Sequence, residues 1–148
     1  MSIAPSSENS SRETTPVELK TGGETVLLVD DDDFVRELAQ EIMEMNGYSV
    51  LTAKTGRIAL QLFAEYNNSV HMLITDVSMP IMSGAELAER LRELRSNLKI
   101  LFTSGYPDHT IKIAPDFFIS KPYSAASLAR KVREVLDVPP TNTRAVLT

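Results

Sequence analysis

The sequence contains no cysteine and only two histidines, His71 and His109. Without cysteine the chain cannot form disulfides or thiolate metal sites, and two histidines are too few for a metal centre built from imidazoles alone. No apolar run approaches the roughly 18 residues that a membrane-spanning helix needs. Residues 1–13 are polar and lack the apolar segment of a secretory signal peptide. Together these absences favour a cytoplasmic protein without a membrane partner.

Basic residues are outnumbered, since the chain has 15 lysines and arginines against 20 aspartates and glutamates and a formal net charge of -5. A general nucleic-acid-binding protein needs a basic surface, so this balance argues against nucleic acid as a partner. With 148 residues, 43% of them hydrophobic, the chain can form one soluble domain with a substantial core.

The two ends of the chain have little apolar surface. Residues 1–24 are rich in Ser, Thr, Glu and Pro, so burial cannot offset the entropy lost on ordering them. The Pro-Pro pair at 139–140 stops any preceding structure. We therefore predict a disordered tail over 1–24, a folded domain over 25–138 and a flexible tail over 139–148. The last tail is too short to form a DNA-binding output domain.

Short apolar runs alternate with helical stripes in the folded part. The predicted strands cover 25–29, 48–53, 70–75, 99–103 and 116–119. The first predicted helix carries Val35, Leu38, Ala39 and Ile42 on one face, and the others lie over 59–66, 84–95 and 124–136. Alternating helices and continuously apolar strands predict an α/β fold with a parallel sheet covered on both faces.

Polar residues of defined type stand at the ends of four predicted strands. They are Asp30–Asp33, Asp76, Thr103 with Ser104, and Lys121 before Pro122. The carboxyl ends of parallel strands lie at one edge of a sheet, so these side chains should converge although they are far apart in the sequence.

Acids that converge repel one another unless a positive charge neutralises them. Mg²⁺ prefers one or two carboxylates together with water and phosphate oxygens, and Asp30 and Asp31 look like such a pair. Asp76 stands alone on a central strand and is the candidate nucleophile for an aspartyl phosphate. Lys121 and the Ser104 hydroxyl would each bind a phosphate oxygen. The pattern therefore predicts phosphoryl transfer.

Each residue taken alone has a simpler explanation. Asp32 or Asp33 can cap a helix, Lys121 can be a surface lysine, and Ser104 can belong to a turn. Their joint occurrence at four strand ends favours phosphate chemistry over these separate explanations.

Two other functions share part of the pattern. A phosphatase similar to the haloacid dehalogenases would use Asp30 as nucleophile and Asp32 as acid/base, but the chain has little room for that fold's cap, and Asp76 would have no role. A flavin-binding flavodoxin needs a Gly/Ser/Thr phosphate loop after the first strand, where this chain has four acids that would repel the phosphate.

Four motifs resemble the receiver domain of two-component response regulators. They are Val-Asp-Asp at 29–31, Thr-Asp-Val-Ser-Met-Pro at 75–80, Thr-Ser-Gly-Tyr at 103–106 and Lys-Pro at 121–122. The resemblance implies a (βα)₅ flavodoxin-like fold with a doubly wound parallel sheet. It implies that a sensor histidine kinase or a histidine phosphotransfer protein donates a phosphoryl group, which switches a surface for a downstream protein target. Such a domain is no conventional enzyme, since it catalyses only its own phosphorylation and dephosphorylation.

The resemblance also implies a role for each matching residue. Asp76 would be the phosphoacceptor and would contact the metal. Asp31 would ligate Mg²⁺ (or Mn²⁺) directly and Asp30 largely through water, and the Ser78 carbonyl would complete the metal site. Lys121 stands at the position of the family's invariant lysine.

Two further positions resemble the family's conformational switch, Ser104 at its Ser/Thr position and Phe118 at its aromatic position. The Thr-Ser-Gly-Tyr form is similar to receivers attached to hybrid sensor kinases. The chain departs from the family between Ser104 and Lys121, where Pro107 and Pro115 leave room for a fourth helix of only about two turns. A shortened fourth helix would alter the face that usually carries signalling or dimerisation.

Overall fold

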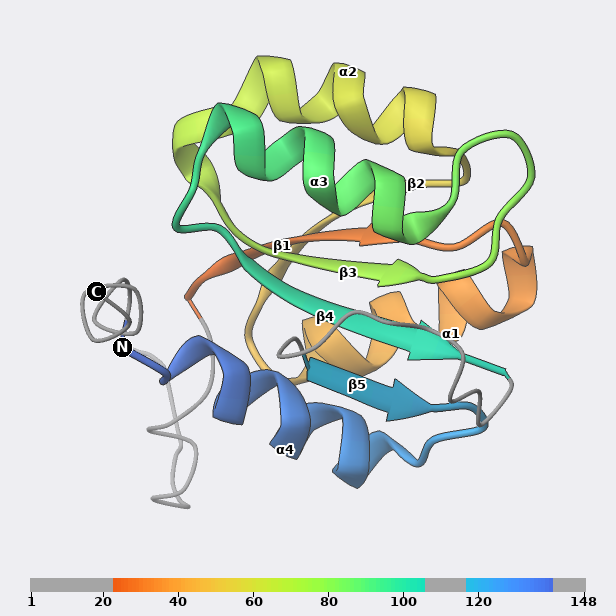
Figure 1. Cartoon of the computed structure of the whole chain (residues 1–148). Helices are drawn as coiled ribbons and strands as arrows, with labels where there is room; N and C mark the ends of the chain where they lie inside the picture. Colours follow the sequence, from red (N-terminus) through yellow and green to blue (C-terminus); the bar gives the residue numbers. More distant parts are fainter. Residues whose placement is uncertain (1–22, 106–116, 140–148) are drawn as a thin grey trace, which may run out of the picture.

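The structure is a computed structural model that describes residues 23–105 and 117–139. A single sheet runs through it, with helices on both sides (Figure 1). The strands are β1 (Thr25–Val29), β2 (Ser49–Ala53), β3 (Val70–Asp76), β4 (Lys99–Ser104) and β5 (Phe117–Ser120). The helices are α1 (Asp33–Met45), α2 (Gly56–Tyr66), α3 (Gly84–Leu94) and α4 (Ala125–Leu136), and a 3-10 turn, η2, covers Asn67–Ser69.

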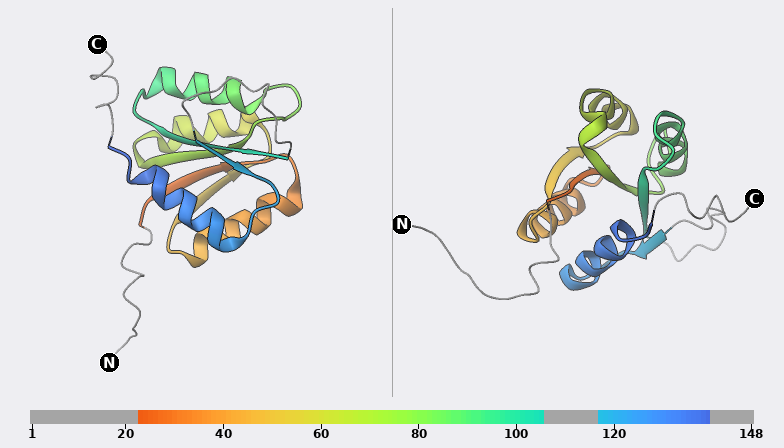
Figure 2. Two further views of the ribbon diagram at one scale, coloured as in Figure 1. Left: turned by 60° about the horizontal axis from the view of Figure 1, so that its bottom comes forward. Right: turned by 90° about the vertical axis from the view of Figure 1, so that its left-hand side faces the viewer.

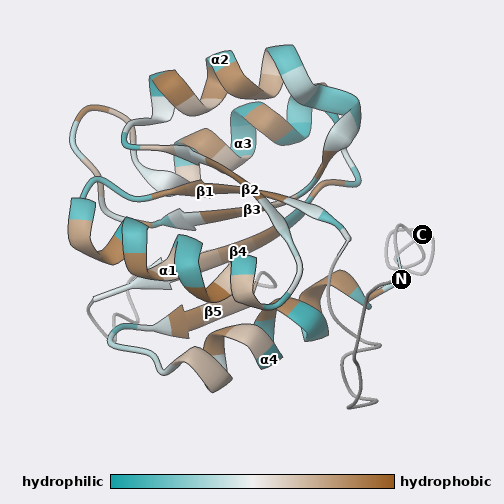
Figure 3. Cartoon of the chain, turned by 180° about the vertical axis from the view of Figure 1, so that it is seen from behind, coloured by the Kyte–Doolittle hydropathy of each residue, from teal (hydrophilic) through white to brown (hydrophobic). Residues whose placement is uncertain are grey.

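All paired strands are parallel, and their order in the sheet is β2-β1-β3-β4-β5. Helices α2 and α3 cover one face, and α1 and α4 cover the other (Figure 2). Each face has its own buried cluster, with Phe63 and Leu87 in the first and Ile42 and Leu128 in the second. Figure 3 shows mainly hydrophobic strands between helices that alternate hydrophobic and hydrophilic residues. The predicted flavodoxin-like α/β fold is confirmed.

The ends of two strands differ slightly from the prediction. The pairing of β3 with β4 continues until Asp76 lies opposite Thr103. As a result Asp76 and Ser104 are the last residues of their strands. The backbone of both residues therefore belongs to the sheet, which positions their side chains more precisely than a loop would.

The buried face of α1 also differs from the prediction. Leu38 was expected on this face, but it is 41% exposed. The buried residues are Ala39, Ile42 and Met43. At 3.6 residues per turn these three form a narrow stripe, and the helix is turned so that Met43 faces the sheet while Leu38 lies at the rim.

Three predictions concern residues outside the described ranges. The short helix between β4 and β5 falls within 106–116, and most of the two tails falls within 1–22 and 140–148. Among the helices of the described residues, none has the length and apolar character needed to cross a membrane.

Candidate functional site

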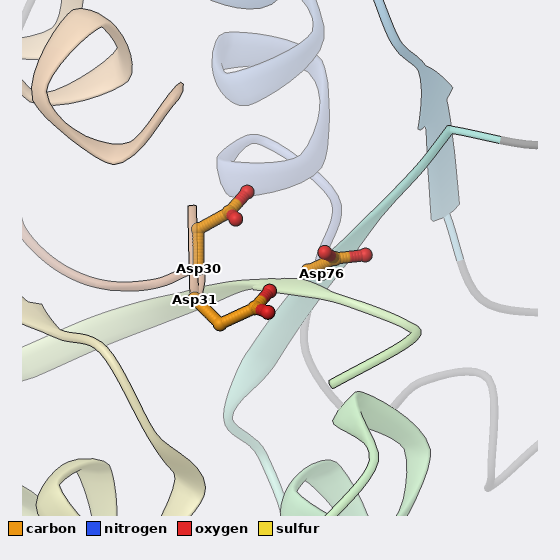
Figure 4. Close-up of side chains that lie close together, drawn as sticks. All are labelled: Asp30, Asp31 and Asp76. Carbon is orange, nitrogen blue, oxygen red and sulfur yellow. The ribbon is translucent and has the colours of Figure 1, made fainter. Parts of the chain in front are cut away.

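Three carboxylates meet at the carboxyl edge of the sheet (Figure 4). Asp30 and Asp31 follow β1 directly, and Asp76 ends the neighbouring strand β3. One oxygen from each carboxylate lies within 4.8 Å of the other two. Asp30 and Asp76 are buried, whereas Asp31 is exposed. The structure thus brings together the three acids that the sequence assigned to one edge.

Asp76 is held at both of its carboxylate oxygens. Oδ1 accepts a hydrogen bond from the Ser78 backbone N–H at 3.1 Å, and Oδ2 lies 3.2 Å from Lys121 Nζ. Burial raises the pKa of Asp76 above its ordinary value, and the positive charge of Lys121 only partly offsets this effect. A further cation bound at this edge would lower the pKa of Asp76 again.

Lys121 bridges the two buried acids. Its Nζ lies 2.9 Å from Asp30 Oδ2 and 3.2 Å from Asp76 Oδ2. Burial by itself lowers the pKa of Lys121, but the two carboxylates outweigh it and leave the pKa above the ordinary value, so the side chain remains an ammonium ion. Its backbone N–H donates to the Ser104 carbonyl at 2.8 Å and anchors the segment after β5 to the end of β4; the Lys121–Pro122 peptide bond is cis.

The loop after β1 organises its own acids. Asp30 Oδ1 accepts a hydrogen bond from the Asp32 backbone N–H at 2.9 Å. Asp32 is the N-cap of α1, and its carboxylate accepts the Val35 N–H at 3.1 Å. Asp32 therefore has a structural role as the helix cap, whereas Asp30 and Asp31 form the carboxylate cluster with Asp76.

The loop after β3 packs closely against the same strand end. The Gly84 N–H donates to the Val77 carbonyl at 2.8 Å. A Cβ atom on Gly84 would lie 2.0 Å from the Asp76 carbonyl oxygen, so a larger residue would force the backbone apart. Ile81 in this loop is fully exposed and has φ 69°, a strained value for a β-branched residue.

The family model for the response regulator receiver domain matches residues 26–133. The chain belongs to this family. Receiver domains bind Mg²⁺ at an acidic pocket, and the oxygen donors of Asp30, Asp31 and Asp76 suit such a hard divalent cation.

Two named relatives are longer proteins. The receiver is 35% identical over 122 residues to the sensor kinase CckA of Brucella abortus, a match that covers 79% of this chain and 13% of the kinase. It is 37% identical over 112 residues to the transcriptional regulatory protein YrkP of Bacillus subtilis, which covers 72% of this chain and 47% of that protein. The chain thus spans less than half of the length of these two curated relatives.

Solved receiver structures match over nearly their whole length. The receiver domain of the hybrid histidine kinase CckA is 32% identical, with a TM-score of 0.68 and coverage of 76% of this chain and 99% of that domain. A response regulator receiver domain protein from Methanospirillum hungatei is 30% identical, with a TM-score of 0.67 and coverage of 77% and 94%. The match to CckA agrees with the similarity to hybrid-kinase receivers that the sequence motifs indicated.

The two expected switch positions of the receiver lie on adjacent strands. Ser104 is buried at the end of β4. Phe118 lies in β5 directly opposite Phe102, and the two rings pack with their centroids 5.5 Å apart. The structure thus places the Ser104 hydroxyl at the carboxyl end of β4 and the Phe118 ring in the neighbouring strand.

Sequence reasoning missed Tyr123 and Arg36 at this edge, and it placed Thr103 here without giving its hydroxyl a role of its own. Burial and the negative charge of Asp30 raise the pKa of Tyr123 to about 12, and its only sequence signal is its place directly after Lys-Pro. The Thr103 hydroxyl is buried opposite Asp76 and has no hydrogen-bond partner within the described residues. The Arg36 guanidinium donates to the Asp30 carbonyl, and its spacing from Asp33 was the available signal.

Proposed function

We propose that this receiver domain accepts a phosphoryl group on Asp76 from the phosphohistidine of a sensor histidine kinase or a histidine phosphotransfer protein. The observation that carries the proposal is the shared contact of Lys121 with Asp30 and Asp76, beside the exposed acid Asp31. An ammonium ion and a cluster of carboxylates around one aspartate oxygen suit the charge of a transferring phosphoryl group.

The chain's own residues have separate tasks in this transfer. An oxygen of Asp76 forms the new bond to phosphorus while the nitrogen–phosphorus bond of the donor breaks, and the imidazole leaves with the electron pair. The Ser78 N–H and Lys121 orient the two oxygens of Asp76. Lys121 Nζ, 3.2 Å from Asp76 Oδ2, lies within reach of a phosphoryl oxygen bound there.

The same acids would hold Mg²⁺ (or Mn²⁺). We assign Asp31 and Asp76 as direct ligands, Asp30 as a ligand largely through water, and the Ser78 carbonyl as a further donor. The bound ion would neutralise negative charge on the phosphoryl group during transfer. This role requires no complete protein cage, because Mg²⁺ keeps several waters and phosphate oxygens in its shell.

Asp76 is favoured over Asp30 as the nucleophile. Both acids have partners on both carboxylate oxygens. Asp76 is distinguished by its place at the end of β3, between β1 and β4 in the sheet, where the resemblance to receiver domains expects the phosphoacceptor. Asp32, the acid/base of the phosphatase alternative, caps α1 instead. This geometry and the family membership leave the phosphatase alternative without support.

The output of phosphorylation would be a population shift. We propose that the Ser104 hydroxyl binds a phosphoryl oxygen and that Phe118 changes its packing in response, which alters a surface read by a downstream protein. The partners are therefore proteins, not nucleic acid or membrane. We place this exchange in the cytoplasm, as the cysteine-free sequence favours.

The test is phosphorylation with acetyl phosphate and Mg²⁺, followed by intact-protein mass measurement and treatment with hydroxylamine. We expect one hydroxylamine-labile phosphoryl group on the unaltered chain and none on Asp76→Asn. Asp32→Asn is the matched control, because asparagine also caps helices and this variant should be phosphorylated normally. Undiminished phosphorylation of Asp76→Asn would refute the proposal and make Asp30 the first residue to test.

A further inference from the structure

The Arg36 side chain, in the first turn of α1, contacts the loop that joins β1 to α1 and carries Asp30 and Asp31. Its NH1 group donates to the Asp30 carbonyl oxygen at 2.8 Å, and its NH2 group pairs with Asp33 Oδ1 at 2.6 Å. The Arg36 side chain is only 14% exposed, whereas that of Asp33 is 70% exposed. The largely buried guanidinium therefore binds the backbone of Asp30 through NH1, while NH2 pairs with a carboxylate at the surface.

The carbonyl contact completes the restraint of Asp30. The Asp30 N–H donates to the Ala53 carbonyl at 3.2 Å, and the Asp30 side chain contacts the Asp32 N–H and Lys121. With Arg36 on its carbonyl, every polar group of Asp30 has a fixed partner.

The restraint matters most for the next residue. Asp31 is exposed, and within the described residues no hydrogen bond or ion pair fixes its carboxylate. The direction of its side chain therefore depends on the orientation of the peptide group between Asp30 and Asp31. That peptide group contains the carbonyl that Arg36 holds.

We propose that Arg36 is a positioning residue for the divalent cation, and this inference rests on the proposed function. By fixing the Asp30–Asp31 peptide group, Arg36 aims the Asp31 carboxylate toward Asp76. Partners that orient metal ligands without touching the ion commonly change metal affinity by roughly 10-fold or more when they are removed.

Two effects of Arg36 on a bound cation oppose each other, which makes the inference testable. The positive charge of Arg36 repels the cation, so charge alone predicts tighter Mg²⁺ binding after its removal. The positioning role predicts weaker binding. Arg36→Met keeps most of the apolar stem and removes the charge, whereas Arg36→Lys keeps the charge and removes the planar fork.

The experiment is a Mg²⁺ titration by calorimetry, with Mn²⁺ binding by electron paramagnetic resonance as a second measure. We expect roughly 10-fold weaker binding for Arg36→Met and a loss in the same direction for Arg36→Lys. Asp33→Asn is the matched control, because it removes the surface ion pair but keeps the contact of Arg36 with the Asp30 carbonyl. Its affinity should change by no more than about twofold, since the Asp33 carboxylate that is removed lies at the surface.

A second readout needs no metal. The Asp32 amide donates to Asp30 Oδ1, so a loosened loop should exchange this amide hydrogen faster in Arg36→Met and Arg36→Lys but not in Asp33→Asn. Unchanged or tighter Mg²⁺ binding in Arg36→Met would overturn the inference, as would unchanged exchange of the Asp32 amide.

Asp31→Asn separates this failure from failure of the proposed function. If Asp31→Asn weakens Mg²⁺ binding and Arg36→Met does not, only the role of Arg36 is wrong. If Asp31→Asn binds Mg²⁺ as tightly as the unaltered chain, the acidic site itself is wrong, and both proposals fail.

Discussion

Asp30 and Asp76 carry the same functional group, but their surroundings differ. Asp30 has partners on its amide, its carbonyl and both carboxylate oxygens. Asp76 shares Lys121 with it, and burial raises the pKa of the Asp76 carboxyl. Both carboxylates have partners on both oxygens, because Asp76 Oδ1 also accepts the Ser78 N–H. A cation bound beside Asp76 would lower its raised pKa again.

Removal of Lys121 should destabilise the fold and increase its response to Mg²⁺. Lys121→Ala leaves two largely buried carboxylates without their ammonium partner, so we expect a loss of about 3 kcal/mol of unfolding free energy. Mg²⁺ should then restore more stability to the variant than it adds to the unaltered chain. Urea unfolding with and without Mg²⁺ measures both effects, and an equal gain in the two proteins would contradict the prediction.

At the scale of the elements, helix starts gather at the edge that carries the acids. Asp32, Thr55, Ser83 and Ser124 each cap the helix that follows them, and each cap accepts a backbone N–H of the first turn. In a parallel α/β fold, the helices after the strands begin at the carboxyl edge of the sheet. The positive ends of their dipoles therefore point to the side where the acids and any phosphoryl group lie.

The contact of α3 with the end of β3 gives a sharp prediction at this scale. Gly84→Ala would place a Cβ atom 2.0 Å from the Asp76 carbonyl oxygen, whereas a Cβ on Gly105 would meet no atom of the described residues within 4 Å. We expect Gly84→Ala to lower the unfolding free energy by about 2 kcal/mol or more and to slow phosphorylation, because Asp76 must shift.

Gly105→Ala is the matched control for stability and should change the unfolding free energy by less than about 0.5 kcal/mol. Thermal and urea unfolding of both variants provide the measurement. Equal stability of the two variants would mean that α3 does not depend on this close approach.

At the scale of the whole molecule, Arg133 joins the two described ends of the domain. From α4 it pairs with Glu24, just before β1, at 2.8 Å and with Asp137 at 2.9 Å. It also donates to the Tyr48 hydroxyl at 3.3 Å. Three segments that are distant in the sequence are thereby tied together at the edge of the sheet opposite the acids.

The pair of Glu24 and Arg133 should contribute about 1 kcal/mol of coupling energy in a double-mutant cycle with Glu24→Gln and Arg133→Met. Burial raises the pKa of Glu24, but the hydrogen bond and charge of Arg133 outweigh it and leave the pKa below its ordinary value. A lowered pKa in the folded state means that this contribution is present above the ordinary pKa of Glu and is lost as the pH falls through the folded value. Urea unfolding at neutral and acidic pH tests this, and a coupling energy independent of pH would contradict it.

The fold was predictable because its signals are local. Continuous apolar runs separated by helical stripes determine a parallel α/β sheet, and the predicted strands agree with the observed ones within one or two residues. The error at Leu38 has a local cause as well, since a stripe at i, i+3, i+4 and i+7 fixes the face of a helix only to within part of a turn.

The residue types of the candidate site were also predictable, because strand ends of a parallel sheet share one edge. The hydrogen bonds of Arg36 and the burial of the Thr103 and Tyr123 side chains were not, because they depend on which atoms face each other after the chain has folded. Arg36 reaches a backbone carbonyl, and every residue carries one, so no sequence pattern marks the partner.

The sequence by itself determined which chemical groups gather at the carboxyl edge: three acids, a lysine and a hydroxyl. Only the tertiary structure decided how they share their contacts. Strand register and burial place one ammonium group between Asp30 and Asp76, assign Asp32 to the helix cap and leave Asp31 exposed. Those outcomes depend on distances of a few ångströms between groups distant in sequence, and such distances are set by packing.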